Sequence, residues 1–86
     1  MATKTDLRDW VYQAVTDAGG KATIVEVAKH IWSKHESELR ASGPLFYTWQ
    51  YDIRWAANRL RRSGVMKAAE SSPTGIWELK PQQTPS

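Results

Sequence analysis

Residues 48–69 read TWQYDIRWAANRLRRSGVMKAA, and the spacing of their apolar side chains changes at Gly64. Before Gly64 the apolar residues repeat with the 3.6-residue period of a helix. One face of that helix would carry Trp49, Ile53, Ala56, Ala57 and Leu60. After Gly64 the apolar residues alternate as they do in a strand. The sequence therefore predicts a helix that begins near Thr48, a possible N-cap, and ends at Gly64.

A β-hairpin is expected after this helix. Residues 65–69 and 76–79 have the composition and alternation of short strands. The residues between them, 70–75, read ESSPTG, which is rich in turn-forming types and contains no Lys or Arg. Any contact of this loop with phosphate would therefore depend on hydroxyl or backbone N–H groups.

Two further helices are expected upstream. The first runs from about Asp6 to Ala18, with Thr5 or Asp6 as its cap, and Gly19-Gly20 ends it because glycine tolerates a left-handed backbone. Its apolar stripe consists of Leu7, Val11, Ala14, Val15 and Ala18. The dipeptide Lys21-Ala22 is long enough only for a turn or a two-residue strand.

The next helix begins with a capping box, in which Thr23 is the cap and Glu26 lies three residues later. Its apolar face consists of Ile24, Val27, Ala28, Ile31 and Trp32. We expect it to end at Ser37 or at Ala41, before the helix-breaking sequence 42–44, SGP.

The order of these elements predicts the fold class. It is mainly α with a small β-hairpin (α+β), in the winged helix-turn-helix arrangement of three helices followed by a two-stranded wing. We assign residues 6–80 to this domain, residues 1–5 to a flexible N-terminus and residues 81–86 to a disordered tail.

Length and composition restrict the class of protein. The chain has 86 residues and no Cys, which excludes a disulfide scaffold, a thiol nucleophile and a Cys-based zinc site. No apolar run approaches the roughly 20 residues that span a bilayer, and no signal peptide is visible. We therefore expect a cytoplasmic protein without membrane contact. So small a domain leaves little room for a substrate pocket, so we expect neither an enzyme nor a cofactor.

The basic residues are concentrated in one segment. The net charge is +3, yet residues 44–69 alone carry four Arg and Lys67 against the single acid Asp52. Arginine suits bidentate contacts with phosphate and guanine, and the third helix of a winged helix commonly enters the major groove. Double-stranded DNA is therefore the expected partner.

Nine residues are candidates for DNA binding. The bases Arg54, Arg59, Arg61, Arg62 and Lys67 would hold phosphate or guanine. Weaker candidates for base contact are Thr48, Gln50, Tyr51 and Asn58. Trp55 follows Tyr51 at helical spacing. It therefore either lies beside Tyr51 and Asn58 on the surface that would contact bases, or packs beneath the second helix or the wing.

Other constellations favour structural roles. Glu78-Leu79-Lys80 matches part of a metal-dependent nuclease signature, but alternation along a strand simply places Glu78 and Lys80 on the solvent face. His30 and His35 lie about 140° apart on a helix, so we expect two surface histidines and no metal site. We find no catalytic arrangement, and the remaining tryptophans are expected to pack: Trp10, Trp32, Trp49 and Trp77.

Two segments resemble the N-terminal winged-helix domain of Mrr-type restriction proteins. They are residues 52–65, DIRWAANRLRRSGV, and residues 73–79, PTGIWEL. In that family, the third helix contains an Arg-Trp-Ala block followed by a Leu, and it ends with a basic residue, Ser or Ala, and Gly. A segment of Gly and an aromatic residue ends its hairpin. The resemblance covers residues 5–80.

The resemblance implies DNA recognition within a restriction-modification setting, where the family domain delivers a separate nuclease domain to modified DNA. Because the winged helix uses up this chain, the expectation here is DNA binding without cleavage. The alternative is a winged helix that binds a protein partner or forms a homodimer. It would show an exposed apolar patch centred on Tyr51 and Trp55, together with salt-insensitive self-association.

Overall fold

The computed structural model describes residues 3–68 and 75–80. The elements in chain order are α1 (Lys4–Asp17), β1 (Lys21–Thr23), α2 (Ile24–Arg40), α3 (Leu45–Arg62) and β2 (Ile76–Glu78). The predicted loop over residues 70–74, the last residue of the predicted first wing strand and the predicted tail over residues 81–86 lie outside the described residues.

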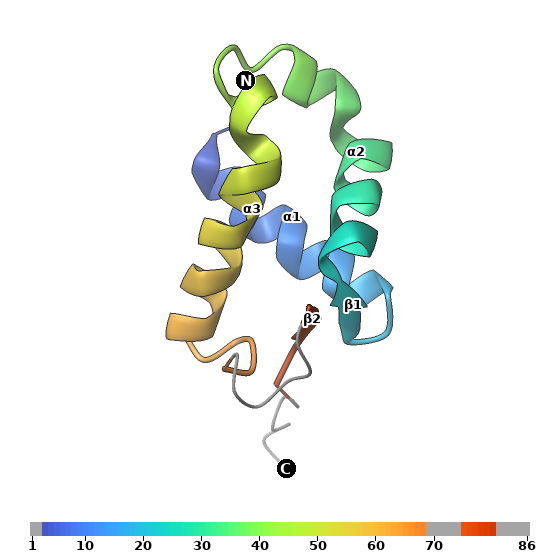
Figure 1. Cartoon of the computed structure of the whole chain (residues 1–86), viewed down its shortest axis with the longest axis vertical. Helices are drawn as coiled ribbons and strands as arrows, with labels where there is room; N and C mark the ends of the chain where they lie inside the picture. Colours follow the sequence, from blue (N-terminus) through green and yellow to red (C-terminus); the bar gives the residue numbers. More distant parts are fainter. Residues whose placement is uncertain (1–2, 69–74, 81–86) are drawn as a thin grey trace.

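The three helices form the body of the molecule (Figure 1). α2 and α3 run in opposite directions, and α1 crosses behind them and packs against both. The sheet closes one end of this arrangement, whereas the turn between α2 and α3 lies at the other end. The described part of the chain is therefore mainly helical with a small antiparallel sheet, as the α+β prediction required.

The core lies where the predicted apolar stripes meet. The residues predicted for the third helix, Trp49, Ile53, Ala56, Ala57 and Leu60, are all buried. Four of the five predicted for the first helix are also buried, and only Ala18 is exposed. Met66 and Trp77 close the core from the side of the sheet, so the third helix is held by apolar burial on α1 and by the sheet.

The sheet differs from the expected hairpin. β2 pairs with β1 in antiparallel register, with Ala22 opposite Trp77, and residues 65–68 contribute only the isolated bridge between Met66 and Leu79. The reason lies at the end of α3, where the N–H groups of Val65 and Met66 both donate to the carbonyl of Leu60, at 3.0 and 3.2 Å. The Val65 N–H is therefore not free to extend the pairing beyond the bridge.

β2 nevertheless lies between β1 and the residues after α3. On one side, the Leu79 N–H donates to the Gly20 carbonyl (2.8 Å). On the other side, the Lys67 N–H donates to the Glu78 carbonyl (2.9 Å) and the Lys80 N–H donates to the Val65 carbonyl (3.0 Å). Lys21-Ala22, expected to form at most a turn or a two-residue strand, is thus part of the three-residue strand β1, a full partner in the sheet.

Two helix starts lie earlier than predicted. α1 begins at Lys4 with Thr3 as its N-cap, whose N–H donates to Asp6 Oδ2 at 2.9 Å. α3 begins at Leu45 after Pro44, so Thr48 lies inside the helix and does not cap it. Pro44 is the sequence feature that indicates the earlier start, because the fixed φ of proline suits the first turn of a helix. The longer of the two predicted ends for the second helix is confirmed, since α2 ends at Arg40.

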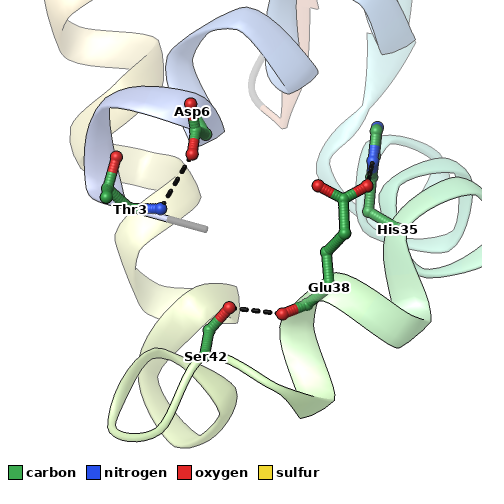
Figure 2. A network of polar contacts seen from close by, with 5 residues as sticks. All are labelled: Thr3, Asp6, His35, Glu38 and Ser42. Atoms are coloured by element: carbon green, nitrogen blue, oxygen red, sulfur yellow. Dashed lines mark hydrogen bonds and ion pairs between the residues drawn. The ribbon is translucent and has the colours of Figure 1, made fainter. Parts of the chain in front are cut away.

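Polar contacts fix the turn between α2 and α3 (Figure 2). The buried Ser42 hydroxyl donates to the Glu38 carbonyl, and the Glu38 carboxylate lies 3.0 Å from Nδ1 of His35. His35 has non-helical backbone angles inside α2, and its ring stacks on Trp10 of α1 at a centroid distance of 3.8 Å. The turn is therefore tied through α2 to α1.

The predicted capping box at the start of α2 is confirmed. The Thr23 hydroxyl accepts from the Glu26 N–H at 3.1 Å, and Glu26 Oε1 accepts from the Thr23 N–H at 2.9 Å. The bond from the Thr23 N–H lowers the pKa of Glu26 below its ordinary value of 4.5, helped by the Thr23 side chain and by attraction to Lys29. Folding therefore favours the ionised Glu26.

This capping box predicts a pH-dependent contribution to stability. Because the folded pKa is depressed, the contribution is complete above pH 4.5 and is lost as the pH falls through the lower folded value. Glu26→Gln keeps the acceptor but removes the titration. Urea unfolding at about pH 6 and about pH 3 should show a smaller acid-induced loss in the variant than in the wild type. Equal losses would contradict this assignment.

Candidate nucleic-acid interface

The apolar stripe of α3 determines which side chains reach solvent. Because that stripe faces the core, the rest of the helix surface is turned toward solvent, and we call its exposed part between Gln50 and Arg62 the outward face. It carries five of the nine predicted site residues: Gln50, Tyr51, Arg54, Asn58 and Arg62. The structure thus brings these five together on one surface of one helix.

The polar groups of this face are available for a ligand. Within residues 3–68 and 75–80, the side chains of Gln50, Arg54, Asn58 and Arg62 take part in no hydrogen bond or ion pair. No acidic residue of α3 is exposed. The face therefore presents two uncompensated guanidinium groups and two amides.

The single acid of the helix lies on the other side. Asp52 is buried, with 8% of its surface exposed, and the Thr48 hydroxyl donates to its Oδ2 at 2.7 Å. The Lys4 ammonium lies 3.9 Å from its other oxygen. Sequence reasoning treated Asp52 only as a charge in a basic segment, although the Thr48–Asp52 spacing of four residues was a signal for this pair.

The other four predicted site residues, Thr48, Arg59, Arg61 and Lys67, make contacts within the fold. Thr48 bonds Asp52, and the Arg61 Nε–H donates to the Lys67 carbonyl at 3.2 Å. The Lys67 ammonium lies 3.2 Å from Glu78. This ion pair also corrects the expectation of a solvent-facing Glu78, because the carboxylate, on a half-buried residue, is turned to the segment after α3.

Arg59 lies on the flank of α3 that faces α1. Its guanidinium lies 5.5 Å from the centre of the Trp55 ring, and the Lys4 ammonium lies 5.1 Å from the same ring. Trp55 is half-buried, so packing describes it better than exposure on a surface that would contact bases. One of its neighbours is Lys4 at the start of α1, which begins earlier than predicted.

The two histidines are more buried than expected. His30 Nε2 lies 3.0 Å from Asp17 at the end of α1, and the side chains of His30 and His35 are 28% and 25% exposed. Each bonds a carboxylate and keeps about a quarter of its side chain exposed, so the expectation of two surface histidines holds in part. Among residues 3–68 and 75–80, no cluster of His, Asp and Glu side chains has the make-up of a metal site.

A groove runs between α2 and α3 beside the outward face. Its upper part, about 370 Å³, is lined by Trp32, Phe46 and Trp49, and its lower part, about 560 Å³, is lined by Val25, Tyr51 and Arg54, among others. Both parts share Ala28, Lys29 and Gln50, so they adjoin one another. Neither part is lined by an acidic residue.

Two further exposed residues belong to this surface. Tyr47 is 83% exposed and Val25 is 62% exposed, while the predicted Tyr51 is 77% exposed. The sequence places Tyr47, like Thr48 and Gln50, near the start of the predicted helix, where the first residues of a recognition helix would lie, whereas Val25 was not singled out. Once the helix begins at Leu45, Tyr47 and Tyr51 lie one turn apart on the same face.

Comparison of the chain with protein-family models, curated proteins and solved structures gave no match. In the described parts of the chain, no helix has the length and apolar character needed to cross a membrane. The interface is therefore argued from its own geometry.

The exposure of the tyrosines predicts that they contribute little to folding. The double variant Tyr47→Ser/Tyr51→Ser should unfold within about 0.5 kcal/mol of the wild type, because neither ring is buried. Trp49→Ala in the same helix should cost about 3–5 kcal/mol. Chemical unfolding followed by circular dichroism measures both, and a loss above about 1 kcal/mol in the double variant would show that the rings belong to the core.

Proposed function

We propose that this chain binds duplex DNA through the outward face of α3, without catalytic activity of its own. The fold would act as a winged helix-turn-helix, in which α3 enters the major groove and the segment that includes β2 flanks it. The resemblance of residues 52–65 and 73–79 to Mrr-type winged-helix domains supports the same role.

One observation carries the proposal: the exposed side of α3 combines guanidinium groups and amides that have no partner among the described residues, and α3 itself exposes no carboxylate. Arg54 and Arg62 are two helical turns apart, so they could meet phosphates or guanines at separate points along a groove. Asn58 lies between them, where an amide could pair with an adenine edge.

The contacts within the fold rank the basic residues. Arg54 and Arg62 carry the strongest case because nothing in the described residues neutralises them. Arg59 and Arg61 flank the face and are held in part by Trp55 and the Lys67 carbonyl, respectively, so they rank below Arg54 and Arg62. Lys67 is the weakest of the five because it is paired with Glu78.

The proposal predicts the salt dependence of binding. Removing one phosphate-contacting cation lowers the slope of log K against log salt by about 1 and weakens binding to all duplex sequences. Arg54→Ala and Arg62→Ala should each do so in fluorescence-anisotropy titrations of a short duplex at several salt concentrations.

Lys34→Ala is the matched control for these variants. Lys34 is an exposed cation on α2 that lines neither part of the groove. Its removal changes the net charge by the same amount, but the slope should stay at the wild-type value. Equal slopes in Arg54→Ala, Arg62→Ala and Lys34→Ala would mean that binding follows net charge and does not use the outward face.

A second candidate function has one observation in its favour. The exposed Tyr47 and Tyr51 rings are of the residue type enriched at protein–protein interfaces, so this face could instead bind a protein partner or a second copy. Trp55, which the same hypothesis placed in the patch, is half-buried.

Sedimentation at low and high salt separates the two functions. If this face serves to bind DNA and not a second copy, the chain should sediment as a monomer when no DNA is present. Self-association that is insensitive to salt and is abolished in Tyr47→Ser/Tyr51→Ser would favour the interaction module.

A further inference from the structure

The upper part of the groove between α2 and α3 has an aromatic floor. The Trp32 and Trp49 rings are stacked, with centroids 5.9 Å apart and planes 9° apart, and the Phe46 ring lies 6.4 Å from Trp32. Trp49 is buried, whereas Trp32 and Phe46 are half-buried and line the opening. The floor is therefore a set of flat apolar rings that solvent reaches.

Cations and an amide surround this floor. The Arg40 guanidinium lies 5.2 Å from the Trp32 ring and 5.8 Å from the Phe46 ring, and its Nε–H donates to Glu36 at 2.8 Å. Lys29 and the unpaired Gln50 amide stand on the rim. Arg54 continues the positive rim along the lower part.

The chemistry of the groove restricts its occupant. A second copy of this chain would bring another positive rim against the first, so charge disfavours self-association there. An occupant that is flat and apolar at the floor but negative at the rim fits both features. A nucleotide outside the base-paired stack has this composition, because its base stacks on aromatic rings while its phosphate meets cations.

We propose that this groove binds one unpaired nucleotide next to a duplex held on the outward face of α3, an inference that rests on the proposed function. Trp32 and Phe46 provide the stacking surface, Gln50 bonds the edge of the base, and Lys29 and Arg54 bind the adjoining phosphates. The upper part, about 370 Å³, lies within the range of roughly 300–1,000 Å³ typical of small-ligand sites.

The position of Gln50 links the two surfaces. It lies on the outward face of α3 and also lines both parts of the groove. Arg54 likewise belongs to the outward face and to the lower part of the groove. A strand that leaves the duplex near Gln50 would therefore enter the groove without leaving the positive surface.

The test uses labelled DNAs of one sequence: a fully paired duplex and the same duplex with one bulged nucleotide. Anisotropy titrations should show the bulged duplex binding about tenfold more tightly, which is the size of one base–aromatic stack. In two-dimensional NMR spectra, the indole N–H of Trp32 should shift with the bulged duplex and not with the paired one.

Trp32→Leu should abolish this preference while leaving the affinity for the paired duplex unchanged. Since Trp32 stacks on Trp49, the variant is first checked for native circular dichroism. Gln50→Ala serves as a second variant because its side chain is exposed and outside the core, and it should reduce the preference.

The outcomes separate this inference from the proposed function. Equal affinity for the two DNAs, with Trp32 unshifted, would overturn the groove assignment and leave duplex binding intact. Absence of binding to both DNAs at low salt would overturn both proposals. If a helical peptide of Leu and Glu shifts Trp32 and the bulged duplex does not, the groove belongs to a protein partner and the inference is wrong.

Discussion

The burial of the apolar stripe of α3 against α1 is the constraint on which the rest of the structure depends. Ile53, Ala56 and Ala57 are almost completely buried, and two of these are alanines, so the backbones of the helices can approach closely. A side chain lost from this stripe leaves a cavity that the tightly packed helices cannot easily fill. Once the stripe faces inward, the helical period determines which residues face outward. The arrangement of Arg54, Asn58 and Arg62 is therefore a consequence of core packing.

The same constraint separates the charges of α3. Asp52 is drawn into the fold, where Thr48 and Lys4 satisfy its carboxylate, so it does not oppose the arginines on the other side. Contacts at the end of the helix instead reduce the basic charge that is free for a ligand. Arg61 bonds the Lys67 carbonyl and Lys67 pairs with Glu78, and both contacts hold the segment that returns to the sheet. A count of basic residues in this segment thus overstates the number that a ligand meets.

The sequence predicted the helices and their buried faces because both follow from the local period of apolar residues. It did not predict the pairing of β2 with β1, since the strands are far apart in the chain and their register depends on the end of α3. The start of α3 was missed because Thr48 is a good cap by type, whereas Pro44 permits an earlier first turn. Val25 was not singled out, and the groove between α2 and α3 arises from helix packing that no local pattern encodes.

Amide NMR of isotope-labelled protein, titrated with a short paired duplex at low and at physiological salt, tests the central claim most directly. The account predicts salt-sensitive shifts concentrated at Gln50, Tyr51, Arg54, Asn58 and Arg62, with smaller changes in the segment from Val65 to Lys67. Shifts on α1 alone, or no shifts at low salt, would contradict DNA binding through the outward face of α3.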